Sequence, residues 1–138
     1  MGIKKKSRTL EFPKTCKSFT VDAFGGARVT VIDSRKKFYK WIEDNELENL
    51  DFADDWDTCN GSAIALHSRE RVDYVITLKS NTLKVIVHEC VHIAHFILEN
   101  KGIPNDHQNS EVMAYLTDYI FGEVCKIAKP KRLDKETN

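Results

Sequence analysis

The residues with the clearest chemical potential form the sequence His88-Glu89-Cys90-Val91-His92. On a helix, residues four positions apart differ by about 40° in direction, so the imidazoles of His88 and His92 project side by side. Two neutral imidazoles at this spacing can bind one Zn²⁺ at about 2.0–2.1 Å. Glu89 lies about 100° round the helix from His88, where a carboxylate can take a proton from a water at the metal. Cys90 points away from this side and is not counted as a ligand. The motif predicts a zinc site with Glu89 as general base.

The motif lies in a strongly apolar segment, residues 82–100, that is predicted to be a helix. Apolar side chains cover most of its circumference, which is typical of a central, buried helix. Polar side chains in such a helix need partners, because burying them unpaired costs several kcal/mol. The polar stripe of His88, His92, His95 and Glu99 therefore favours a bound metal over two structural histidines.

A catalytic zinc needs a third protein ligand and one open position. Glu111 is the leading candidate, because it opens the first turn of the next expected helix and eighteen residues separate it from His92. The turn at residues 102–104 would fold that helix back against the motif helix. His107, in the connecting loop, could replace Glu111 as the ligand; a solvated or capping histidine is the alternative.

Two further side chains share a helix face with Glu111, at four and seven residues on: Tyr115 and Asp118. Either Tyr115 or His107 could donate a hydrogen bond to the oxyanion of a tetrahedral intermediate, although for Tyr115 a position at the edge of the core is the favoured interpretation. Asp118 could accept the second ring N–H of a liganding histidine, or be a surface acid.

His95 is not expected to join the same metal ion. It follows His88 by seven residues, which places it about 10 Å further along the helix axis. A hydrogen bond to Glu99 or Asp118 is the better expectation for its ring.

The elements that must position these residues follow from the periodicity of the rest of the chain. The pattern predicts a strand at 28–32, a helix at 35–48 capped by Asp33 or Ser34, a hairpin of strands 63–67 and 72–78, the motif helix capped by Ser80 or Asn81, and a last helix at 108–126. This order of strand, helix, hairpin, helix and helix indicates an α+β domain.

The length of 138 residues fits one domain. We expect a basic flexible arm over residues 1–18, a single domain over 19–126 and a basic tail over 127–138. The formal net charge is zero, which argues against a dedicated nucleic-acid partner. The acidic residues 51–57 read as an irregular loop, whose Trp56 could form a binding lip if the loop is open.

The four cysteines are far apart in the sequence, and no two of them form a CxxC pair. The first residues lack the apolar stretch of a signal peptide, and no segment approaches the length of a membrane span. We therefore expect a reduced, soluble protein in the cytoplasm, with free thiols and no membrane partner.

The motif together with its downstream glutamate resembles the gluzincin metallopeptidases, in which a Glu on the second helix is the third zinc ligand. The resemblance rests on His88-Glu89-x-x-His92, the following eighteen residues and Glu111-Val-Met-Ala114. The segment from Asn109 to Tyr115 looks like the Asn-Glu-x-x-Ala element of that family, with one residue inserted. The metzincin pattern does not fit, because Leu98 stands where its third His belongs.

The resemblance implies a small zincin-like α+β domain, in which a short mixed sheet with a hairpin packs on the motif helix and a ligand-bearing helix follows. It covers roughly residues 61–125 and looks like a minimal version, of the kind found among small phage and prophage proteins. It implies a zinc-dependent peptidase acting on a peptide or protein substrate. The alternatives are a zincin-fold binding or regulatory protein without catalysis and, less favoured, a nucleic-acid-associated module.

Overall fold

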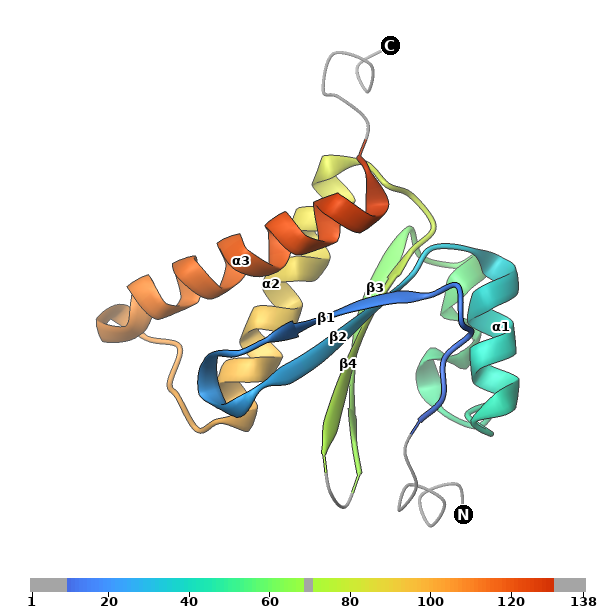
Figure 1. Cartoon of the computed structure of the whole chain (residues 1–138), viewed down its shortest axis with the longest axis horizontal. Coiled ribbons are helices and arrows are strands. Elements are labelled where there is room, and N and C mark those ends of the chain that lie inside the picture. Colours follow the sequence, from blue (N-terminus) through green and yellow to red (C-terminus); the bar gives the residue numbers. More distant parts are fainter. Residues whose placement is uncertain (1–9, 69–70, 131–138) are drawn as a thin grey trace.

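The computed structural model of the chain describes residues 10–68 and 71–130 (Figure 1). In chain order the strands and α-helices are β1 (Lys17–Val21), β2 (Ala27–Ile32), α1 (Arg35–Asp44), β3 (Gly61–His67), β4 (Val72–Leu78), α2 (Leu83–Asn100) and α3 (Ser110–Ala128). Short 3₁₀ segments are η2 (Ala23–Gly25), η3 (Asp51–Asp57) and η4 (His107–Asn109).

The described residues form one four-stranded sheet with the order β1-β2-β4-β3. β2 and β4 are parallel, whereas β1 pairs with β2 and β3 with β4 in antiparallel fashion. The predicted hairpin is therefore confirmed, with a register that runs from Gly61 opposite Leu78 to His67 opposite Val72. Because β4 lies between β2 and β3, β3 is the hairpin strand that forms a sheet edge in the described part of the chain.

Helices cover both faces of the sheet, with α2 and α3 on one side and α1 on the other (Figure 1). Successive residues of a strand point to opposite faces, so in β4 Tyr74 and Ile76 pack towards α2 and α3 while Val75 packs towards α1. β4 is buried on both faces for this reason, and five of its seven residues are hydrophobic, the exceptions being Asp73 and Thr77. The mixed α+β class is confirmed.

The motif helix α2 begins one residue later than predicted and has a different cap. Its N-cap is Thr82, whose hydroxyl accepts a hydrogen bond from the Val85 amide at 3.4 Å, and not Ser80 or Asn81. The sheet and α3 cover only part of its circumference, so that Val87 remains 42% exposed and both motif histidines are exposed. The prediction of a helix buried all round is therefore wrong.

The acidic segment 51–57 is also different from the prediction. It forms η3, and Trp56 is only 7% exposed because its ring packs against Phe38 at a centroid distance of 5.6 Å. Both aromatic residues belong to the cluster on the α1 side of the sheet. The idea of an exposed binding lip at Trp56 is therefore wrong.

The folded part begins earlier than the predicted boundary at residue 19. Phe12 stacks on Trp41 at 5.6 Å, and the Asn45 side chain accepts from the Glu11 amide and donates to the Glu11 carbonyl. The remainder of the predicted arm, residues 1–9, and most of the predicted tail, residues 131–138, lie outside the described residues.

The four cysteines are unpaired, as expected. Of the helices within residues 10–68 and 71–130, none has both the length and the apolar character that crossing a membrane requires.

Candidate metal centre

α2 places His88 and His92 one turn apart on its exposed side. Their Nε2 atoms are 3.2 Å apart, and their rings meet edge to face with centroids 4.8 Å apart. The ring of Phe96, one turn further on, stacks on His92 with centroids 6.2 Å apart, which limits the orientations open to that imidazole. The side-by-side projection of the two imidazoles is confirmed.

Glu89 leaves the same helix towards the sheet and is only 6% exposed. Burial raises the pKa of its carboxyl above the ordinary value, and the neighbouring His88 and His92 act in the opposite direction. Within the described residues its carboxylate has no hydrogen-bond or ion-pair partner. Glu89 is therefore a buried carboxylate beside two exposed imidazoles.

Gly61, the first residue of β3, contributes to the site in a way that the sequence pattern did not predict. A Cβ at this position would lie 2.7 Å from Val85 Cγ1, 3.1 Å from the Thr77 carbonyl oxygen and 3.2 Å from Glu89 Cγ. The absence of a side chain thus lets the edge strand approach Glu89 closely. The Asn60-Gly61 pair is one signal in the sequence, but it indicates only a turn.

The donor atoms of His88, Glu89 and His92 all lie within 4.8 Å of one another. Two nitrogens that bind one tetrahedral zinc at about 2.05 Å each are separated by about 3.3 Å, close to the 3.2 Å between the Nε2 atoms. The motif therefore forms a group that could hold a metal ion, and its geometry fits zinc.

A groove of about 480 Å³ gives access to this group from the amino-terminal end of α2. It is lined by Asn60, Gly61, Ser80, Thr82, Lys84, Val85, His88 and Glu89. A ligand in this groove would reach one imidazole and the buried carboxylate at once.

Neither Glu111 nor His107 belongs to the three-residue group that the structure forms. Glu111 is an exposed residue in the first turn of α3, and His107 is exposed in η4. α3 crosses α2 obliquely, and its amino-terminal end extends well beyond α2 (Figure 1). The ligand roles of these two residues stay predictions.

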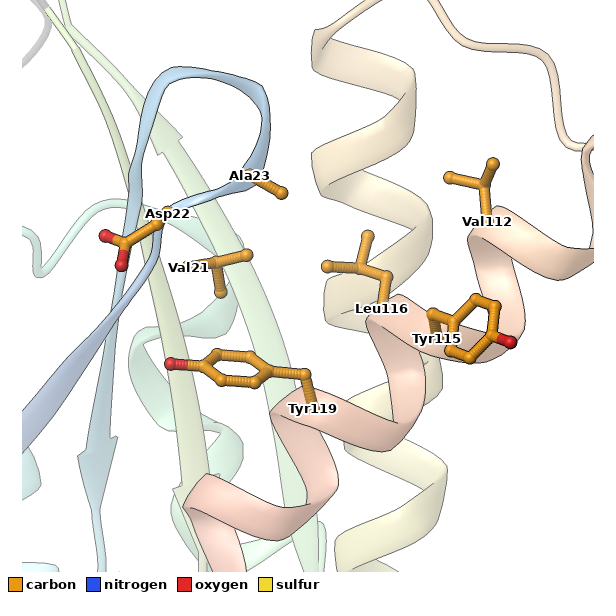
Figure 2. Close-up of a pocket in the computed structure, with 7 residues that line it drawn as sticks. All are labelled: Val21, Asp22, Ala23, Val112, Tyr115, Leu116 and Tyr119. Atoms are coloured by element: carbon orange, nitrogen blue, oxygen red, sulfur yellow. The ribbon is translucent and has the colours of Figure 1, made fainter.

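Tyr115 lies at a different hollow of the molecule. It is 71% exposed and lines an apolar pocket of about 410 Å³ between α3 and the end of β1, together with Val21, Leu116 and Tyr119 (Figure 2). Its hydroxyl points away from Val21 in this view, and the motif residues do not line the pocket. Its oxyanion role stays a prediction.

The prediction that the His95 ring forms a hydrogen bond with Glu99 or Asp118 is wrong. Its ring nitrogens lie 3.1 and 3.4 Å from Asn105 Nδ2, in the loop after α2, rather than near Glu99 or Asp118. The loop folds back onto the last turns of α2, a contact that local sequence spacing does not reveal. Asp118 instead lines a shallow hollow with Val87 and Val91, next to the motif.

No model of a known protein family, no curated protein sequence and no solved structure matches this chain.

Proposed function

We propose that the chain hydrolyses peptide bonds with the help of one zinc ion, which His88 and His92 hold beside Glu89. The observation that carries this proposal is the 3.2 Å separation of two exposed Nε2 atoms next to a buried carboxylate. Zinc, when bound, would polarise the scissile carbonyl and lower the pKa of a water molecule.

Glu89 would act as the general base. Its burial raises the pKa of the carboxyl, which makes the ionised form a stronger proton acceptor than an exposed glutamate. It would take the proton of the attacking water and then pass it to the departing amine. A non-catalytic binding site would need no carboxylate at this position.

The edge strand β3 supports an extended peptide as the substrate. Its outer edge has no partner strand in the described part of the chain, so a peptide backbone could add to it as a further strand. Gly61 begins this strand in direct reach of Glu89, so the added peptide would run past the catalytic group. We also propose that the chain is a minimal gluzincin of the phage type and that it acts in the cytoplasm.

Glu89→Gln tests the mechanism, because it keeps the shape of the side chain and removes the base. We expect the purified variant to keep about one zinc per chain by elemental analysis and to lose cleavage of a mixed peptide library. Glu99→Gln, an exposed carboxylate on the same helix, is the matched control and should keep both properties.

Retained cleavage in Glu89→Gln would contradict the role of Glu89 as base. Undiminished cleavage after complete removal of zinc by a chelator would contradict the role of the metal.

A further inference from the structure

A polar hollow of about 550 Å³ lies at the carboxy-terminal end of α2. It is bordered by this helix end, by the β1–β2 connection beside it (Figure 1), and by the adjoining ends of β3 and β4. The residues used below are Gly25, Gly26, His67, Ser68, Tyr74 and Lys101. Asn100, also in its wall, follows His92 by eight residues, or about 12 Å along the helix axis. The polar hollow is therefore separate from the metal centre, and its size is within the range of small-molecule sites.

The hydroxyl of Tyr74 is buried in the wall of the polar hollow. Tyr74 is only 1% exposed, and its hydroxyl has no hydrogen-bond partner of normal geometry within the described residues. The side chain of Asn100 lies beside it as a donor and lowers the pKa of the phenol, although burial, which raises this pKa, is the larger effect. The phenolic proton thus lacks an acceptor, which is unfavourable for a buried hydroxyl. A ligand that accepts a hydrogen bond from Tyr74 would remove this cost.

Two further donors lie around the polar hollow. Lys101 is exposed, and its Nζ is 3.9 Å from the place of a Cβ on Gly25, so that the ammonium group lies close to the β1–β2 connection. Within residues 10–68 and 71–130, no carboxylate forms an ion pair with it. His67, the last residue of β3, is paired with Val72, whose side chain packs on the α2 side of the sheet. Residues directly opposite each other share a face, so the His67 imidazole lies on this side as well.

The charge around the polar hollow is positive. None of the described residues that line it is acidic. At its rim, the Arg71 guanidinium pairs with Asp73 at 2.8 Å, and the same carboxylate accepts from Arg28 at 2.9 Å, so that two positive charges face one negative charge. The carbonyls at a helix end disfavour an anion, but here amides of the following loop donate to those of Ile97, Leu98 and Glu99.

We propose that the polar hollow binds the phosphate group of a small molecule. Three donors line it from three elements: the Tyr74 hydroxyl from β4, the Lys101 ammonium from the end of α2 and the His67 imidazole from β3. A carboxylate offers two oxygens in one plane, whereas a phosphate offers three acceptor oxygens that can meet donors from several sides. Gly25 and Gly26, both at φ +88°, carry no side chain on the β1–β2 side, which leaves room for the rest of the molecule.

Binding of inorganic phosphate to the zinc-free protein gives the first test. The isotope-labelled protein is treated with a chelator and titrated at constant ionic strength, and its amide signals are followed by NMR. We expect saturable shifts at Gly25, Gly26, Ser68 and Lys101, and no such shifts with acetate. The absence of these shifts at millimolar phosphate, or equal binding of acetate, would overturn the proposal.

Tyr74→Phe separates a hydroxyl that binds a ligand from one that supports the fold. The variant keeps the ring and removes a hydroxyl without a hydrogen-bond partner, so the urea midpoint should not fall. We expect its affinity for phosphate to fall by about 3–10-fold, the loss typical of one hydrogen bond. Phosphate affinity equal to that of the wild type would contradict the role of Tyr74 and with it the site.

Lys101→Gln tests the charge of the polar hollow. We expect it to weaken phosphate binding by about 10-fold or more, because a charged donor is lost. Lys36→Gln, which removes an exposed lysine of α1 on the other side of the sheet, is the matched control and should bind like the wild type. Equal losses in the two variants would indicate only general attraction of phosphate to positive charge and would overturn the site. All these measurements use the zinc-free protein, so their outcome does not depend on the proposed peptidase activity.

Discussion

Gly61→Ala offers a direct test of the contact between the edge strand and Glu89. The added methyl would lie 2.7 Å from Val85 Cγ1 and 3.1 Å from the Thr77 carbonyl oxygen, both shorter than ordinary van der Waals contacts. The Val85 side chain is part of the core around α2, and the Thr77 oxygen belongs to the backbone of the central strand β4. Neither can move away freely, so the strand must shift outward.

Overpacking of this kind costs about 1–3 kcal/mol of folding free energy. With a urea dependence of about 2 kcal/mol/M, this corresponds to a decrease of about 0.5–1.5 M in the unfolding midpoint. Glu89 Cγ, 3.2 Å from the new methyl, must give way as well, so we expect cleavage to fall more than the stability loss alone explains. Zinc content should change little, because the nearest contacts of the new methyl are Val85, Thr77 and Glu89 and not an imidazole.

Gly122→Ala is the matched control for this substitution. Gly122 lies inside α3, and a Cβ there would meet no other atom within 4 Å. Alanine favours a helix over glycine by about 0.5–1 kcal/mol, so the urea midpoint should rise by about 0.25–0.5 M. A Gly61→Ala variant as stable as the wild type, measured beside this control, would refute the close approach of β3 to α2.

Two further predictions concern stability. In the zinc-free protein the folded state holds the proton of Glu89 more tightly than the unfolded chain does, because burial raises the pKa of this carboxyl. Glu89→Gln should therefore raise the urea midpoint at about pH 7.5, and the gain should shrink as the pH falls through the raised pKa; a gain that grows on acidification would contradict this. Asn45→Ala removes the three hydrogen bonds that join the Asn45 amide to both backbone groups of Glu11 and to the Trp41 carbonyl, at 2.7–2.8 Å. We expect a loss of about 1–3 kcal/mol by urea unfolding, together with faster proteolysis before β1; unchanged proteolysis would show that residues 10–16 are held by other contacts.

Element types were predictable where the periodicity was strong. The hairpin, the cap of α1 at Ser34 and the extent of α2 followed from alternation, a capping hydroxyl and an apolar run ended by Gly102. The spacing in the motif also predicted the pairing of its two imidazoles, because four residues make about one turn of any α-helix.

The predictions that failed concerned burial and partners. Trp56 is buried because Phe38, from a distant part of the sequence, covers it. His95 contacts Asn105 because the loop folds back over the end of α2. Neither contact follows from local spacing, since each depends on how separate elements pack.

The sequence by itself determined which residues could bind a metal and that one helix would carry them. Only the tertiary structure decided that His88 and His92 face solvent and that Glu89 is buried against Gly61. The physical reason is that side-chain direction is a local property of the helix, set by about 3.6 residues per turn. Exposure and pKa depend instead on the register and angle at which α2 packs on α3 and on the sheet.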